Sequence, residues 1–188
     1  MSTVAAIQGP SWVVVGYDSQ VSEDSGRKYV LPSDAGKVVE NNEYIFGVAG
    51  DLRAVNILSH AFIPPDPGKK LGAELDEFMS TKFVLALKKC FDTNFYGKDG
   101  EQGSNILIAV NGTVYEIGGN YDCVRDVYGY YSVGTGSPYA LGALHANIPE
   151  RLTLKVAKDR VYEAVRVATL LDTSSCEPVT IKVQHWNG

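Results

Sequence analysis

Residues 1–18 read MSTVAAIQGPSWVVVGYD, in which two apolar runs flank the turn residues Gln8–Ser11. β-Branched residues favour a pleated, buried surface, while glycine and proline favour a turn, so the pattern predicts a β-hairpin. In a hairpin, the start of the first strand and the end of the second strand lie side by side. We therefore expect Ser2 and Thr3 to lie next to Asp18.

Ser2 is a small residue directly after Met1, which is normally the condition for removing an initiator methionine. Without Met1, Ser2 would carry a free α-amine and a hydroxyl on the same residue. An α-amine has an unperturbed pKa of about 7.7–8.0, so it can accept the hydroxyl proton near neutral pH. This is the chemistry of an N-terminal nucleophile, in which base and nucleophile share one residue. If Met1 is retained, the Ser2 nitrogen is an amide and the base is missing.

The composition bounds the class of protein. The chain has 188 residues, 45% of them hydrophobic, which predicts one domain over residues 1–188 with a sizeable core. A net charge of -5 without a block of Lys or Arg argues against binding to nucleic acid or to an anionic membrane. The apolar runs are far shorter than the ~20 residues of a membrane span, and no signal peptide is recognisable.

The three cysteines, Cys90, Cys123 and Cys176, are widely spaced and form no zinc-type pattern. They indicate reduced thiols and a cytoplasmic protein, and we expect neither a metal ion nor another cofactor. The histidines, His60, His145 and His185, are scattered along the chain and receive no functional role.

Hydrophobic periodicity orders the rest of the chain. A polar loop is expected over residues 19–28, and Asp51 is a plausible N-cap for a first helix. The clearest helix spans about residues 71–95, and Asn111–Gly112 predicts a second hairpin. Further helices follow residues 134–138 and span residues 152–171. Strands are expected at residues 29–32, 37–40, 44–50, 105–110, 113–117, 122–126, 130–133 and 179–183. This order suits an α+β fold, a four-layer αββα sandwich of two antiparallel sheets between helical layers.

Several separated motifs, in this order and over essentially the whole chain, resemble the β-type subunits of the proteasome and most closely the bacterial HslV peptidase. Ser2 matches the N-terminal nucleophile, which is more commonly threonine, without a gap through to the acid Asp18. The third-strand lysine corresponds to Lys37. The remaining matches are Ala49–Gly50, the GTGSPYA motif of residues 134–140 with Thr135 where the family has serine, and Asp172 with Ser175.

The resemblance implies a role for each matched residue. Lys37 would lower the proton affinity of the Ser2 hydroxyl and α-amine, and Asp18 would pair with Lys37 and orient it. The amide of Gly50 would bind the oxyanion that forms when a peptide carbonyl is attacked. Thr135, Asp172 and Ser175 would hold the α-amine and its proton-relay water. Substrate contacts are expected from Ser22, Val48, Ala49 and Leu52, with Val48 indicating an apolar specificity pocket.

The implied protein is a subunit of a self-compartmentalising peptidase, assembled as a ring or double ring and supplied with polypeptide by an ATPase unfoldase. Two other functions remain open. With Met1 retained, the same fold would serve as a catalytically silent structural ring component. A monomer with an open site would instead be an amidase that uses an N-terminal nucleophile on a small amide.

Overall fold

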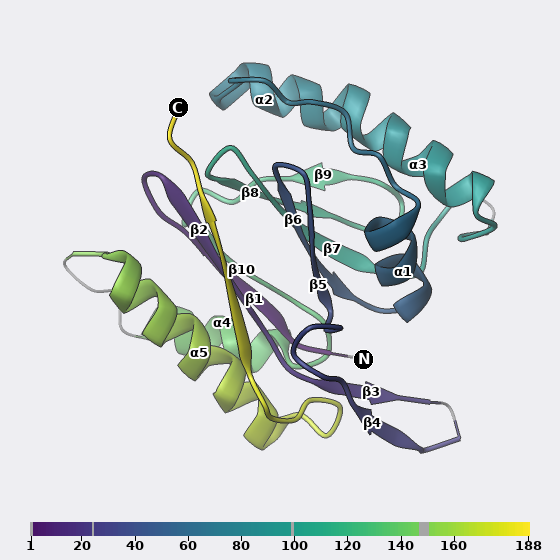
Figure 1. Ribbon diagram of the computed structural model, residues 1–188. Coiled ribbons are helices and arrows are strands. Elements are labelled where there is room, and N and C mark those ends of the chain that lie inside the picture. Colours follow the sequence, from purple (N-terminus) through teal and green to yellow (C-terminus); the bar gives the residue numbers. More distant parts are fainter. Residues whose placement is uncertain (1, 24, 99, 147–150) are drawn as a thin grey trace.

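The computed structural model describes residues 2–23, 25–98, 100–146 and 151–188, which form two sheets stacked between two helical layers (Figure 1). The first sheet has the order β10-β1-β2-β11 and is covered by α4 and α5. The second sheet has the order β5-β6-β7-β8-β9 and is covered on its outer face by α1, α2 and α3. Every strand pair in both sheets is antiparallel. The expected four-layer αββα architecture is confirmed.

The first sheet consists of β1 (Val4–Gln8), β2 (Trp12–Tyr17), β10 (Tyr130–Val133) and β11 (Thr180–His185), and its helices are α4 (Ser137–Ala146) and α5 (Leu154–Leu171). The second consists of β5 (Val38–Asn41), β6 (Tyr44–Ala49), β7 (Asn105–Val110), β8 (Thr113–Ile117) and β9 (Cys123–Val124). Its helical layer contains α1 (Leu52–His60), α2 (Gly72–Phe78), the π-helical turn η1 (Met79–Phe83) and α3 (Val84–Thr93).

Both faces of each central strand are buried, and alternate residues belong to different cores. In β1, Val4 and Ala6 lie between the two sheets, whereas Ala5 and Ile7 face α4 and α5. In β7, Leu107 belongs to the cluster between the sheets, while its neighbours Ile106 and Ile108 belong to the cluster under α1 and α3. The continuous apolar runs in the sequence are therefore strands that separate two cores.

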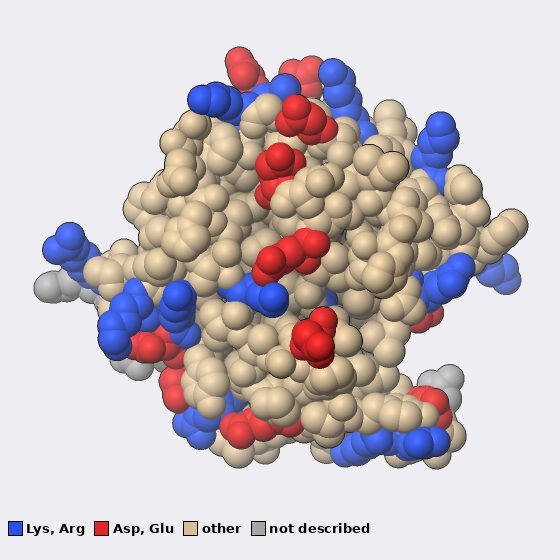
Figure 2. Space-filling view, in the orientation of Figure 1, with Lys and Arg blue, Asp and Glu red and all other residues tan. Residues whose placement is uncertain are grey.

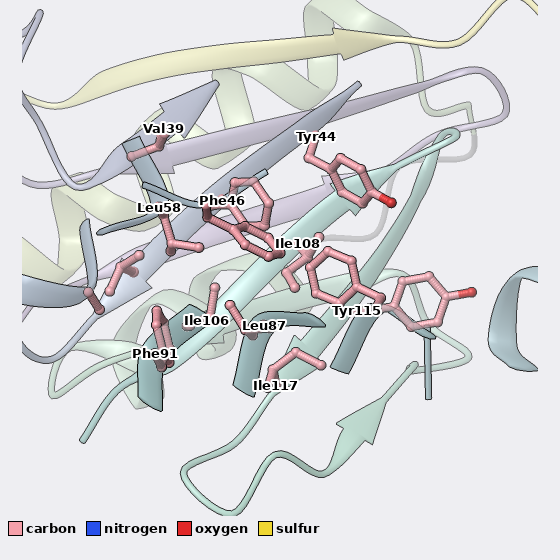
Figure 3. Packing of buried hydrophobic residues seen from close by; sticks show 14 of the residues in the cluster. Val39, Tyr44, Phe46, Leu58, Leu87, Phe91, Ile106, Ile108, Tyr115 and Ile117 are labelled. Carbon is pink, nitrogen blue, oxygen red and sulfur yellow. The ribbon is translucent and has the colours of Figure 1, made fainter. Parts of the chain in front are cut away.

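The core between the second sheet and its helices α1, α2 and α3 is the most aromatic of the three. Phe83 stacks on Phe46 with ring centroids 6.2 Å apart and meets Phe62 edge-on at 5.8 Å. Figure 3 shows Phe46 and Ile106 from the sheet close to Leu87 and Phe91 from α3. The aromatic stripe predicted for residues 71–95 is thus a packing surface, which anchors the helices over the second sheet.

The opening hairpin has the expected geometry. Val4 pairs with Tyr17 and Gln8 with Val13. One step beyond the ladder, the amide of Asp18 donates to the carbonyl of Thr3 at 3.1 Å. The hairpin therefore brings Thr3 beside Asp18, as the first eighteen residues predict.

One local prediction is wrong. Residues 19–28, expected as a loop, contribute to a two-stranded ribbon of β3 (Gln20–Ser22) and β4 (Lys28–Val30) that projects from the layered body (Figure 1). These strands are short and only partly buried, so they carry no hydrophobic alternation. Their placement depends partly on tertiary contacts, such as the Gln20 side-chain amide donating to the carbonyl of Thr173 at 3.0 Å.

Other local predictions hold. The side chain of Asp51 accepts from the amide of Arg53 at 2.8 Å and caps α1. Asn111 and Gly112 have φ values of 48° and 71°, the positive angles that a tight hairpin turn requires. Two elements are shorter than expected: the strand over residues 122–126 is only Cys123–Val124, and the last helix begins at Leu154 after the N-cap Thr153.

Candidate active site

A buried ion pair lies at the end of β2. The ammonium of Lys37 is 2.6 Å from Asp18 Oδ1, and the two side chains are 2% and 0% exposed. Lys37 directly precedes β5, so the pair joins the two sheets. Charges this deeply buried are costly unless they are paired and hydrogen-bonded. Each of these two residues therefore depends on the other.

Within the part of the chain that the structure describes, four groups donate hydrogen bonds to Asp18. Lys37 Nζ and the amide of Thr3 both donate to Oδ1, at 2.6 and 2.8 Å. The amides of Gln20 and Cys176 donate to Oδ2, at 2.8 and 3.2 Å. Both carboxylate oxygens therefore have donors. Asp18 consequently fixes the backbone directly after Ser2 and the position of the lysine ammonium.

Burial lowers the pKa of Lys37 below its ordinary value, and the adjacent carboxylate of Asp18 partly offsets this effect. A lowered pKa makes the lysine ammonium a better proton donor than an exposed lysine. The ammonium is held beside the Asp18 oxygen that also binds the Thr3 amide, one residue after Ser2.

Ser2 is 4% exposed and lies two residues before β1. Its carbonyl accepts a hydrogen bond from the amide of Gly136 at 3.4 Å. A Cβ added to Gly134 would lie 1.9 Å from the same carbonyl oxygen, and a Cβ on Gly136 would lie 1.9 Å from Thr3 Oγ1. The two glycines of the GTGSP motif are therefore required by the close approach of the N-terminal strand. Met1 lies outside the described residues.

A chain of hydroxyl groups connects the strand to the end of α5. Thr135 Oγ1 and Ser175 Oγ both donate to Asp172 Oδ2, at 2.9 and 2.6 Å. The Ser175 hydroxyl also lies 2.7 Å from Thr3 Oγ1. The structure thus brings together the three predicted supporting residues and adds Thr3, the residue directly after Ser2.

Gly50 directly follows β6 and precedes Asp51, the N-cap of α1. Its φ of +144° favours glycine, and an added Cβ would lie 2.5 Å from Ser104 Oγ and 2.7 Å from the carbonyl oxygen of Gly103. The Ser104 hydroxyl accepts from the amide of Asp51 at 3.0 Å and fixes this corner. Amides at the start of a helix favour negative charge, so this position suits an oxyanion donor.

Ser2, Lys37 and Gly50 line one cavity of about 720 Å³, here called the Ser2 pocket. It contains three of the four predicted substrate-contact residues, Ser22, Val48 and Leu52. The fourth, Ala49, is not among the lining residues that the structure describes, because its side chain points into the cluster between the sheets. The lining residues that the structure describes are Ser2, Val21, Ser22, Glu23, Lys37, Val48, Gly50, Asp51, Leu52 and Val55.

Sequence reasoning missed four of these lining residues. Val55 lies one turn beyond Leu52, so helical spacing could have found it, and Asp51 directly follows the Ala49–Gly50 motif. Val21 and Glu23 carry no such signal, because they belong to or follow β3, which the sequence indicates as a loop.

Comparison with solved structures supports the same architecture. BPH from Thiobacillus denitrificans, in complex with epoxomicin, superposes with a TM-score of 0.78 at 20% sequence identity, over 99% of this chain and 100% of that chain. A second BPH structure gives 0.77 at 19% identity, over 98% of each chain. Eukaryotic HslV from Trypanosoma brucei gives 0.68 at 21% identity, over 97% of this chain and 99% of that chain.

The chain has the fold of HslV. The predicted resemblance is therefore confirmed at the level of the fold, over nearly the whole length of both chains. No protein-family model matches the sequence. At these identities the HslV-type fold is established, whereas activity has to be argued from the residues around the Ser2 pocket.

Proposed function

We propose that the chain is a subunit of a self-compartmentalising peptidase that hydrolyses peptide bonds with Ser2 as N-terminal nucleophile after removal of Met1. The observation that carries the proposal is the Ser2 pocket, where Ser2 and Gly50 meet the buried Lys37, itself held by Asp18. The HslV-type fold supports a protease of this kind.

The proposed reaction uses groups already in place. The Ser2 hydroxyl attacks the peptide carbonyl while its proton passes to the Ser2 α-amine, and the Gly50 amide binds the developing oxyanion. The tetrahedral intermediate then collapses to an acyl-enzyme, and the α-ammonium gives its proton to the leaving amine. Water, deprotonated by the same α-amine, attacks the ester, and the acid product leaves with the Ser2 hydroxyl restored. The charge of Lys37 lowers the proton affinity of both Ser2 groups.

The buried ion pair weighs against a purely structural subunit. Breaking a buried pair is costly, and replacing both charges by apolar groups is often neutral or stabilising. A subunit needed only for assembly gains nothing from keeping Asp18 and Lys37 buried beside an open pocket. A cavity of about 720 Å³ lies within the usual range of small-molecule pockets, so the state of assembly, and not the size of the pocket, distinguishes a peptidase from an amidase acting on a small amide.

The remaining expectations belong to this proposal. A closed ring or double ring and a partner ATPase unfoldase are supported by the HslV-type fold, and cytoplasmic localisation stays a prediction. No helix in the described ranges is both long and apolar enough to cross a bilayer. On the face drawn in Figure 2, basic and acidic side chains are interspersed, in keeping with a polypeptide rather than a nucleic acid as substrate.

The test combines intact mass with covalent labelling. The wild-type chain and the variants Ser2→Thr and Ser2→Ala are each treated with epoxomicin, a peptide epoxyketone. We expect loss of Met1 in all three chains, one label on wild type and S2T, and none on S2A. Ser2→Ala removes one oxygen and should leave folding unchanged. Retained Met1 with no label in any preparation would overturn the proposal and leave the structural ring component as the function.

A further inference from the structure

The Ser2 pocket has walls of two kinds. Its aliphatic lining comes from β3, β6 and α1, and its two carboxylates come from separate elements. Glu23 directly follows β3, and Asp51 caps α1. Both acidic residues are exposed, so their carboxylates are accessible to solvent. The aliphatic residues are Val21, Val48, Leu52 and Val55.

No cation among the described lining residues neutralises these two carboxylates. Among the described lining residues the only cation is Lys37, and its ammonium is 2.6 Å from Asp18 and buried behind the surface. Arg27 lies over the ring of Tyr29, 4.5 Å from the centroid, but the lining described for the pocket does not include it. The pocket therefore presents net negative charge to whatever enters it.

Neutral donors hold both carboxylates in place. Glu23 accepts from the hydroxyls of Tyr29 and Ser25, at 2.8 and 3.1 Å. Asp51 Oδ1 accepts from the amide of Arg53 at 2.8 Å. These contacts orient the carboxylates without neutralising them, so each can still pair with an incoming cation.

We propose that the Ser2 pocket selects a lysine or arginine side chain on the residue whose carbonyl is attacked. The proposal rests on the proposed function and deepens it, because Ser2 and Gly50 at the pocket wall place that residue's side chain inside the cavity. A long basic side chain lays its methylene groups along Val48 and Leu52 and carries its charge to Glu23 and Asp51. An apolar side chain would use the aliphatic wall but leave both carboxylates unpaired.

The experiment measures kcat/KM on peptides that differ only at this residue. Arginine is compared with citrulline, which has nearly the same shape without the charge, and with leucine and glutamate. We expect arginine to exceed citrulline by about tenfold or more, with glutamate poorest. The arginine preference should shrink as salt is raised, because the carboxylates are solvent-exposed.

Three variants assign the effect to residues. Glu23→Gln keeps an acceptor for Tyr29, and Asp51→Asn remains a good N-cap, so both should fold. Each is expected to lower the arginine-to-citrulline ratio several-fold. Glu77→Gln, an exposed site on α2 away from the pocket, makes the same change in net charge and should leave the ratio unchanged.

The outcomes separate the two proposals. Cleavage with leucine preferred over arginine, or an arginine-to-citrulline ratio that E23Q and D51N leave intact, would overturn the basic specificity while leaving the peptidase in place. No cleavage of any peptide, together with no epoxomicin label on Ser2, would overturn the peptidase itself and the specificity with it.

Discussion

Asp18 is the residue on which the candidate site converges. A single carboxylate binds the amide that follows Ser2, the ammonium of Lys37 and the amide of Cys176, so it links the first strand, the fifth strand and the segment after α5. Its position follows from the hairpin alone, because Asp18 lies one step beyond the β1–β2 ladder. A local turn in the first eighteen residues thereby places an acid against the start of the chain.

Asp18→Asn should reveal the cost of leaving Lys37 unpaired. Removing one partner of a buried ion pair typically costs about 3–5 kcal/mol, since the other charge stays buried without compensation. The double variant Asp18→Asn/Lys37→Met removes both charges, so it should recover part of that loss. Urea unfolding of wild type, Asp18→Asn, Lys37→Met and the double variant measures the coupling energy between the two charges. A double variant no more stable than D18N would show that the pair contributes little.

Gly134 tests the close approach between the GTGSP motif and the first strand. With φ of +100° and an added Cβ 1.9 Å from the Ser2 carbonyl oxygen, Gly134→Ala must displace the strand. We expect a loss of about 3 kcal/mol or more and loss of Ser2 labelling. Gly26→Ala is the matched control, because φ is +85° there and nothing lies within 4 Å of the added Cβ.

The control should lose only about 1–2 kcal/mol, the usual cost of placing an L-residue in the left-handed backbone conformation. Thermal unfolding and epoxomicin labelling of the two variants give both readouts. Equal effects at Gly134 and Gly26 would mean that the contact with Ser2 does not constrain the strand.

At the scale of elements, β8 contains an acidic residue, Glu116, whose ionised form lowers the stability of the folded state. Glu116 is half-buried, and burial together with the nearby Asp122 raises the pKa of its carboxyl. An acid whose pKa is higher in the folded state contributes stability that is present at low pH and lost as pH rises through the folded pKa. At neutral pH, ionised Glu116 therefore weakens the sheet.

Glu116→Gln should stabilise the protein at pH 7, by up to about 1 kcal/mol, because the amide does not ionise. The difference from wild type should vanish below about pH 4, where the carboxyl is protonated in both states. Urea unfolding at pH 4, 5, 6 and 7 measures it, with the exposed Glu77→Gln as control. A gain that persists unchanged at pH 4 would point to packing rather than charge.

The elements also show how far sequence reasoning reaches. The hairpin of residues 1–18, the helical segment over 71–95 and the Asn111–Gly112 turn depend on local periodicity and turn chemistry, and each is present. The β3–β4 ribbon was not predicted because its strands are short and partly exposed. The resemblance identified Asp18, Lys37, Thr135, Asp172 and Ser175, and the structure connects them in hydrogen-bonded groups.

The acidic pocket wall could not be predicted in the same way. Glu23 reaches the Ser2 pocket only because β3 and β4 pair and project there, and Asp51 has a local explanation as a helix cap. Neither residue carries a periodic signal. The proposed preference for a basic side chain therefore depends on how the fold places these two residues. The buried core and the matched motifs, in contrast, can be predicted from local sequence patterns.

At the scale of the whole molecule, exposed apolar residues bear on assembly. Leu170 and Leu171, at the end of α5, are 69% and 58% exposed, and Tyr139 and Tyr162 of the same helical layer are also exposed. Large contiguous apolar patches on a surface mark contacts with other chains, and we propose the adjacent pair Leu170 and Leu171 as part of such a contact. Asp172 follows Leu171 directly, so a contact formed here would lie beside the hydrogen-bonded group that links Asp172 and Ser175 to Thr3.

We expect the native protein to be an oligomer, with a mass of several times the 20.4 kDa chain, as a closed assembly requires. The double variant Leu170→Gln/Leu171→Gln should shift it toward smaller species, because it removes apolar area from the proposed contact. Leu85→Gln, a 67% exposed site on α3 in the opposite helical layer, is the control. Native mass spectrometry across a dilution series compares the three proteins.

Each result has a distinct meaning. Disruption by the α5 variant but not by L85Q would locate a contact at the end of α5. Disruption by L85Q alone would place the contact on the α2–α3 layer and contradict the prediction. A wild-type protein that stays monomeric at every concentration would contradict assembly altogether. The Ser2 pocket would then be open to solvent, which is the arrangement expected of an amidase rather than of a compartmentalised peptidase.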